Sequence, residues 1–421
     1  WHRRTCWPKA GRTALTEPCC REHPCVAAAV FLHSSDESAH VAQYTYMDLV
    51  SQLYSDNFDG VLAAWCHAHH CEHIGHTIED NNATARLGYG AGHFYRAMAH
   101  QDMAGIDVVI QQLLPGMDEG MFKGMHSPGW DGEFFTYMLG KLGASLAHLN
   151  PAQKGRAMCE LFGAYGWGEG NRLCKWLSDY MLVRGINHFV PHAFSPVFPN
   201  PDCPPHFGAE GRDPQFSGFT KLMRYGNQVS HLLCGAKHEA DVAIVYHAEL
   251  EWCNGASSML TQVPAKILYE QQMDFDILPF DALASANVED GLLRVNEETY
   301  KALLVPGCAA LPEALLAILQ RLENAGLPVW FVEERPKEAD FGLVVSQACL
   351  AEEAKKFATV HIAPANPLLR VYRAQREADW IYMLVNESTV HCYEGEITVP
   401  EARECLRLDL LLDRRSKLRV H

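Results

Sequence analysis

The sequence contains no run of 18 or more apolar residues, so it offers no candidate for a transmembrane helix. It is also poor in positive charge, because 35 Lys and Arg residues stand against 51 Asp and Glu residues and leave a formal net charge of −16. A chain this acidic is repelled by nucleic acid and by anionic membranes. We therefore expect neither as a partner, and a neutral or cationic ligand fits the charge better.

Motifs that indicate a metal or a nucleotide are absent as well. The fifteen cysteines form no paired CxxC pattern, and neither HExxH nor GxxxxGK[ST] occurs. The histidine-rich segment HAHHCEHIGH (67–76) lies at the carboxyl end of a predicted helix, where His side chains interact with the last free carbonyls. The glycines of GYGAGHFYRA (88–97) fit a loop and a helix start. The sequence therefore predicts no metal and no cofactor.

The first residues, from Trp1 onward, are basic but lack the apolar core and the cleavage site of a signal peptide. Cysteines are spread thinly and are odd in number, which is typical of a reduced protein. Together these features predict a cytoplasmic location.

What the sequence does have is the composition of a globular chain. Its 421 residues are 48% hydrophobic and 20% charged, which is enough for two or three domains with sizeable cores.

Short apolar segments alternate with amphipathic ones between residues 40 and 200, which predicts βα units and a parallel sheet. The predicted strands are 72–80, 105–112, the start of 156–167, and 186–194. Helices are predicted at 44–57, 59–71, 134–149 and 171–185. Residues 195–230 begin with SPVFPNPDCPPHFG and are predicted to form a long loop.

A second α/β unit is predicted from residue 241, with apolar strands at 241–247, 274–279, 300–307 and 327–334. Helices near 260–272 and 312–325 separate these strands, a pattern that favours a smaller doubly wound, flavodoxin-like domain. From about residue 367 the pattern becomes that of β-strands, and this third unit is short.

Polar side chains gather at the carboxyl ends of the first set of strands, which is where α/β folds build their sites. Among them are His76, Glu79, Asp80, Gln111, Glu160 and His192.

Glu160 is the sharpest catalytic candidate. It ends the apolar stretch AMCE, and Tyr165 and Trp167 follow closely. Aromatic faces beside a carboxylate suit sugar binding, and glycosidic bond cleavage generally uses two carboxylates. The alternative is structural, with Glu160 paired to an Arg or capping the next helix.

The second carboxylate is left open between Glu79, beside Asp80, and Glu37 in the segment SSDES. Glu79 and Asp80 are equally compatible with a charge pair at a helix N-terminus. His76 and His192 are candidates to bind sugar hydroxyls, or are buried histidines with partners inside the protein.

Four segments carry a family resemblance: GHTIEDNN, GHFYRAMAHQDMAGIDVV, CELFGAYGW and RGINHFVPHAFSP. They resemble (β/α)8-barrel glycoside hydrolases of the β-galactosidase and α-L-rhamnosidase-like kind, in several of which the barrel precedes a flavodoxin-like, amidotransferase-related domain and a β-sandwich. The resemblance implies an irregular segment at 1–39, the carboxyl-terminal part of a TIM barrel at 40–235, the flavodoxin-like domain at 236–360 and an incomplete β-sandwich at 361–421.

In such retaining barrels the nucleophile ends the seventh strand, and the resemblance places Glu160 there. It also implies an N-terminally truncated fragment, since only about half of the barrel strands are found. We therefore expect a glycoside hydrolase acting on O-glycosidic bonds of a carbohydrate, with Glu160 as nucleophile or base. In relatives with this layout the second domain mediates association of chains.

Two other hypotheses stay open. One is a non-catalytic carbohydrate-binding or scaffold protein derived from such an enzyme. The other is an amidotransferase or hydrolase that works through Cys308, which follows the strand KALLVPG.

Overall fold

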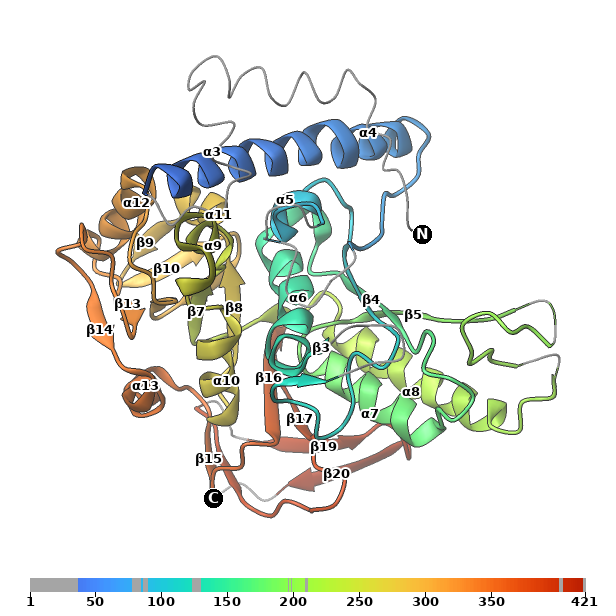
Figure 1. Cartoon of the computed structure of the whole chain (residues 1–421). Helices are drawn as coiled ribbons and strands as arrows, with labels where there is room; N and C mark the ends of the chain where they lie inside the picture. Colours follow the sequence, from blue (N-terminus) through green and yellow to red (C-terminus); the bar gives the residue numbers. More distant parts are fainter. Residues whose placement is uncertain are drawn as a thin grey trace.

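The computed structural model describes residues 37–77, 85, 90–122, 130–195, 197, 199–208, 211–400 and 404–418. It is an α/β molecule with a first parallel sheet, a second parallel sheet beside it, and antiparallel strands at the carboxyl-terminal end (Figure 1). In these residues no helix is both long and apolar enough to cross a membrane.

The first sheet consists of β1 (Ala104–Val108), β4 (Ala157–Leu161) and β5 (His188–Pro191), all parallel and in this order. A parallel bridge from Ile74 to Met103 adds the preceding segment to the edge beside β1. The predicted strands at 105–112, 156–167 and 186–194 are thereby confirmed. Of the predicted strand 72–80, the described part forms this single bridge.

Helices connect and cover these strands: α6 (Gly140–Leu149) after the π-helical turn η2 (Phe134–Leu139), α7 (Asn171–Leu182) and α8 (Phe216–Leu233). The prediction of a loop over 195–230 is wrong in its second half. The Pro-rich part ends at Pro214, and Phe219, Leu222, Gly226, Val229 and Leu233 recur at helical spacing and are buried.

A long helical arm precedes this unit and lies across one side of the molecule (Figure 1). It comprises α3 (Glu37–Tyr54), the π-helical turn η1 (Ser55–Asp59) and α4 (Gly60–Ala68), and α5 (Phe94–Ala97) packs beneath it. The guanidinium of Arg96 ties the layers together, since it binds Asp48 at 2.7 Å and Asp281 at 2.8 Å.

The second sheet has five parallel strands in the order β14-β13-β12-β7-β8. The strands are β7 (Val242–Val245), β8 (Phe275–Leu278), β12 (Leu303–Val305), β13 (Val329–Val332) and β14 (Leu343–Val345). The helices of this unit are α9 (Ala248–Asn254), α10 (Gln262–Glu270), α11 (Phe280–Ser285), α12 (Glu313–Asn324) and α13 (Gln347–Ala354). A small antiparallel sheet in the same unit consists of β9 (Asn287–Glu289), β10 (Leu292–Val295) and β11 (Glu298–Tyr300). Every predicted strand from 241 to 334 is found, since these short and largely apolar stretches are buried on both faces of a sheet that helices cover.

The β-strands predicted from about residue 367 are found, and they pair antiparallel. β16 (Leu369–Arg376) pairs with β17 (Asp379–Asn386) and with β6 (Lys237–His238). Two smaller antiparallel pairs follow: β15 (His361–Ala363) with β18 (Glu396–Thr398), and β19 (Cys405–Asp409) with β20 (Arg414–Leu418). A further antiparallel pair, β2 (Met121–Phe122) with β3 (Trp130–Asp131), belongs to the first unit.

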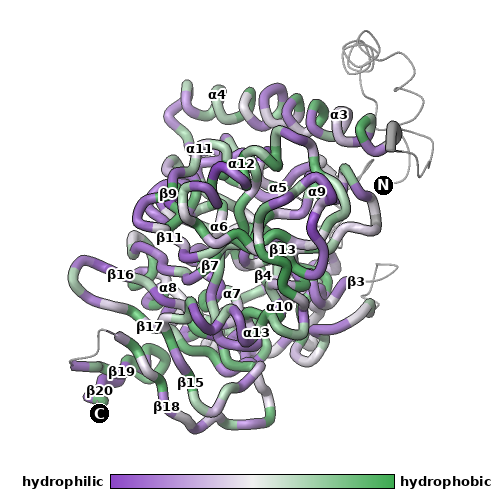
Figure 2. The backbone as a smooth tube through the Cα atoms, turned by 90° about the vertical axis from the view of Figure 1, so that its left-hand side faces the viewer, coloured by the Kyte–Doolittle hydropathy of each residue, from purple (hydrophilic) through white to green (hydrophobic). Residues whose placement is uncertain are grey.

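The two parallel sheets share one continuous hydrophobic core, which contains both Ile106 of the first sheet and Ile277 of the second. Hydrophobic colouring follows β7 and β13 through the interior in Figure 2. The carboxyl-terminal sheet is attached by a smaller hydrophobic cluster, in which Leu182 and Val229 join Tyr372 and Val385, and by a buried ion triad. Glu387 contacts Arg184 at 2.7 Å and Arg370 at 2.8 Å, and all three side chains are at most 5% exposed.

Candidate functional site

Strand register decides which side chains share the open face of the first sheet. Gly143 of α6 packs against Ile106, so Ile106 faces the covering helix. Its neighbour Asp107 points to the opposite face, because successive side chains of a strand alternate. Glu160 lies in register with Asp107 on the adjacent strand and therefore shares that face.

A glycine brings the third member of the group into place. A Cβ on Gly105 would lie 1.8 Å from the carbonyl oxygen of Gly75, so only glycine allows the segment around residue 75 to approach β1 this closely. This approach delivers His76 to the two carboxylates.

The resulting contacts form a small histidine–carboxylate cluster. His76 Nε2 lies 3.1 Å from Glu160 Oε2, and His76 Nδ1 lies 3.8 Å from Asp107 Oδ1 and 3.3 Å from the Thr77 carbonyl oxygen. Glu160 is 29% exposed at its side chain, whereas Asp107 is buried. We call Glu160, His76 and Asp107 the strand-end cluster.

The electrostatics favour an ionised Glu160. Its hydrogen bond with His76 lowers the pKa of the carboxyl group and outweighs the opposing effect of partial burial. The same bond raises the pKa of His76, burial opposes the rise, and Asp107 adds to it. The pair is thus poised as a carboxylate beside an imidazolium at mildly acidic pH.

His192 completes the neighbourhood of Glu160. It follows β5, lies against Gly163, and its charge contributes to the lowered pKa of Glu160. Its Nδ1 is buried without a hydrogen-bond partner in the described part of the chain. The sequence-based grouping of His76, Glu160 and His192 is therefore reproduced in space, while Asp107 was missed. The signal for it was a lone acid inside the apolar stretch GIDVV.

The candidates for the second carboxylate are not brought to this cluster by the described residues. Glu79 and Asp80 lie outside them. Glu37 is the first residue of α3, whose packing partners are α9 and α5 rather than the ends of β1 and β4.

Tyr165 and Gln111, two of the residues predicted to contact sugar, form hydrogen bonds between loops. Tyr165 is 5% exposed, and its hydroxyl donates to the Leu113 carbonyl at 2.8 Å. Gln111 donates to the Tyr165 carbonyl at 3.2 Å. Both side chains fasten the loop after β4 to the loop after β1, so the expectation that they face an open sugar site does not match their hydrogen bonding.

Trp167 remains on the surface, with 50% of its area exposed. It lines a separate pocket of about 230 Å³ together with Glu169, Arg212 and Phe219. None of the three strand-end residues lines that pocket.

The histidine-rich segment makes hydrogen bonds with acidic side chains. His67 lies 2.8 Å from Asp102, and His73 lies 2.9 Å from Asp59. These contacts anchor the segment that carries His76.

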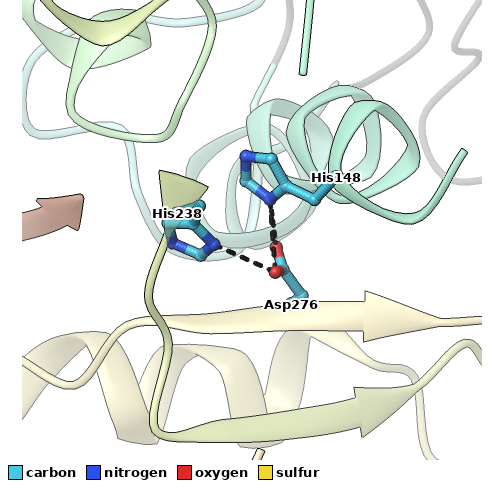
Figure 3. A group of neighbouring side chains, drawn as sticks. All are labelled: His148, His238 and Asp276. Carbon is cyan, nitrogen blue, oxygen red and sulfur yellow. Dashed lines mark hydrogen bonds and ion pairs between the residues drawn. The ribbon is translucent and has the colours of Figure 1, made fainter. Parts of the chain in front are cut away.

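A different trio has the residue types of a metal site: His148, His238 and Asp276, all buried (Figure 3). The two imidazole rings are stacked, with centroids 4.2 Å apart and planes only 18° from parallel. Each ring directs its nitrogen lone pair within its own plane, so two stacked rings cannot point at a common ion. Lys141 lies 3.4 Å from Asp276 and places a positive charge against the same carboxylate. The geometry is that of a charged hydrogen-bond network, not of a chelate.

Cys308 does not have the environment of a nucleophile. Its side chain is fully buried, and burial, with smaller contributions from Cys253 and Glu334, raises the pKa of the thiol. Because the thiolate is the reactive form, the hypothesis of catalysis through Cys308 loses its basis.

The sequence matches no family model and no curated protein. Solved structures do match. Gan42B, a GH42 beta-galactosidase from G., is 10% identical with a TM-score of 0.62, and the match covers 96% of this chain and 73% of that one. The apo exo-carrageenase GH42 from Bacteroides ovatus is 11% identical with a TM-score of 0.61, covering 99% and 63%.

A rhamnosidase from Novosphingobium sp. PP1Y is 17% identical with a TM-score of 0.58, and the match covers 84% of this chain. The chain corresponds to only 34% of that enzyme. At these identities the similarities show a shared fold: the chain has a mixed α/β, glycoside hydrolase-like fold with parallel sheets.

Proposed function

We propose that the chain carries the nucleophile side of a glycoside hydrolase site, with Glu160 as nucleophile or base. The main observation behind this proposal is the position of the Glu160 carboxylate. It is ionised and partly exposed at the end of a parallel strand, next to His76. The similarity in fold to glycoside hydrolases supports the same conclusion.

The geometry suits attack on an anomeric carbon. His76 contacts Oε2, and among the described residues no hydrogen bond reaches Oε1 of Glu160. A carboxylate with one oxygen held and one open can form a glycosyl–enzyme bond, or take a proton from water, while an acid protonates the leaving oxygen. Asp107 would keep the imidazole of His76 oriented. Of the two candidates for the acid we retain Glu79, because α3, which carries Glu37, packs against α9 and α5 rather than at the ends of β1 and β4.

The proposal extends to the architecture. The four segments around Ile74, β1, β4 and β5 follow one another in chain order, as the last four strands of a (β/α)8 barrel would. Numbered along the chain, the second sheet has the strand order 2-1-3-4-5, which supports a flavodoxin-like domain. Within this proposal the domain limits are 40–235, 236–360 and 361–421.

The test is Glu160→Gln, assayed on an aryl β-galactoside and an aryl α-rhamnoside. We expect turnover to fall by roughly 10²-fold or more, since a neutral amide neither attacks carbon nor accepts a proton. Glu72→Gln is the matched control, because Glu72 is exposed and pairs with Arg156 away from the strand-end cluster.

Equal turnover by Glu160→Gln and wild type would remove Glu160 from the mechanism. Binding of either glycoside by a wild-type chain that hydrolyses neither would favour the non-catalytic carbohydrate-binding alternative.

A further inference from the structure

The pocket beside Trp167 has the features of a built ligand site. It lies between the start of α7 and the start of α8, and its cavity measures about 230 Å³. This is smaller than the ~300–1,000 Å³ typical of sites for drug-sized ligands and is suited to one small ring. Its lining consists of Trp167, Glu169, Asn171, Cys174, Pro205, Phe207, Arg212, Asp213, Pro214, Gln215 and Phe219.

A buried carboxyl group in this pocket lacks strong hydrogen-bond partners. Glu169 is only 7% exposed, and in the part of the chain that the structure describes no N–H or O–H group donates to its oxygens, while the neighbouring Cys174 thiol is a weak donor. Burying such a group without a partner costs free energy, so native proteins rarely leave one unsatisfied without a reason. A bound ligand with hydroxyl groups would supply the missing hydrogen bonds.

The carboxyl group is also kept uncharged. Desolvation raises the pKa of Glu169 to about 8, and the nearby Cys174 thiol opposes this shift only in part. At neutral pH the group therefore offers one hydrogen-bond donor and one acceptor.

The walls around Glu169 are aromatic. The rings of Phe207 and Phe219 are stacked at 3.9 Å with planes 9° apart. Trp167, with its ring 5.8 Å from that of His206, presents a half-exposed indole. An indole of this kind can stack on the apolar C–H face of a sugar ring.

The charges of Arg212 and Asp213 on the lining balance. The lining carries one charge of each sign, on Arg212 and Asp213, so these two residues give it no net charge and a neutral ligand fits it. We propose that this pocket binds a neutral pyranose sugar between Trp167 and Glu169, as a carbohydrate site separate from the strand-end cluster. The proposal does not depend on Glu160 being catalytic.

The test measures sugar binding by calorimetry and saturation-transfer NMR in the wild-type protein, since free monosaccharides have no glycosidic bond to be hydrolysed. The probes are D-galactose and L-rhamnose, with methylammonium and acetate as charged probes. We expect saturable binding of at least one sugar. Adding Glu169→Leu should weaken it about tenfold or more through the lost hydrogen bonds, and Glu169→Gln should largely preserve it.

Trp167→Ala should weaken binding roughly two- to tenfold, and Trp167→Phe should restore part of the loss. Because Trp167 is half exposed, these variants keep the test decisive even if Glu169→Leu does not fold. The proposal is overturned if neither sugar binds saturably, if the Trp167 and Glu169 variants bind like the parent, or if a charged probe alone occupies the pocket.

Discussion

The protein contains two groups of histidines and carboxylates that look alike in composition and differ in environment. In the strand-end cluster, Glu160 is partly exposed, and the described residues give its carboxylate one hydrogen-bond partner, His76. In the second group, Asp276 is completely buried and accepts hydrogen bonds from His148, His238, Ser145 and Tyr300 at 2.9–3.1 Å. We call Asp276, His148 and His238 the buried cluster (Figure 3).

The two carboxylates differ in how many hydrogen bonds they accept from the protein. Asp276 has several strong donors around both oxygens, so no reacting group could reach it. Its network joins α6 of the first unit, β8 of the second sheet, and β6, which pairs with the carboxyl-terminal strands. Glu160 keeps an accessible oxygen at an edge of the fold. The comparison therefore assigns the buried cluster to cohesion of the molecule, and it leaves the strand-end cluster as the one with a carboxylate open to a ligand, as the proposed function requires.

Removing the charge of Asp276 should have the largest effect on stability. His238 places Nδ1 3.1 Å from Asp276 and Nε2 2.8 Å from Asp274, so both ring nitrogens donate and the ring is a cation. Asp276→Asn leaves this cation and Lys141 partly uncompensated in the interior. We expect the free energy of unfolding in urea to fall by roughly 3–5 kcal/mol.

Glu160→Gln, at the other cluster, is the matched comparison and should change the unfolding free energy by less than about 1 kcal/mol. If both variants lost the same stability, the division of roles between the two clusters would be untenable.

The second-largest expected effect is on the pH dependence of the unfolding free energy, to which the buried cluster should contribute. Burial lowers the pKa of His238, but the charge of Asp276 and other neighbours outweighs it and raises the pKa well above 6.5. Burial raises the pKa of Asp276, yet the charges of His148, His238 and Lys141 outweigh it and lower the pKa well below 3.8. The contribution of His238 is therefore complete below pH 6.5 and is lost as the pH rises through its folded pKa. That of Asp276 is complete above pH 3.8 and is lost as the pH falls through its folded pKa.

Above pH 6.5 the folded state holds a proton on His238 that the unfolded state releases. The unfolding free energy should then decline by up to ~1.4 kcal/mol per pH unit, on account of this one group. Urea titrations from pH 6.5 to 9 measure the slope, and Asp276→Asn should flatten it. A slope that Asp276→Asn leaves unchanged would show that another group is responsible.

Local patterns in the sequence predicted much of the fold. Apolar strands such as 242–245 and 303–305 are buried on both faces, and that requirement is visible in three or four consecutive apolar residues. The helix α8 was missed because the Pro-rich start of 195–230 dominated the interpretation of the whole segment. Its apolar spacing begins only after Pro214.

Site residues could be predicted from the sequence only where the position of a single residue within a local pattern identified it. Glu160 ends an apolar strand and could be found in this way. The network around Asp276 could not, because its members come from positions 141, 145, 148, 238, 274 and 300, and only tertiary packing brings them together. Asp274 and Asp276 interrupt the apolar stretch DFDIL, which identifies buried acids but not their partners.

The smallest expected effect is a change in the pKa of His76. In wild type this pKa should lie above 6.5, because Glu160 and Asp107 favour the imidazolium. Glu160→Gln should lower it more than Asp107→Asn, since the Glu160 oxygen lies at 3.1 Å and the Asp107 oxygen at 3.8 Å. NMR titration of the imidazole resonances measures both shifts, and His76→Gln assigns the signal among the 22 histidines. An equal pKa of His76 in wild type and in Glu160→Gln would mean that the contact between His76 and Glu160 does not exist in solution. Glu160 would then lack the feature that distinguishes it from an ordinary surface acid.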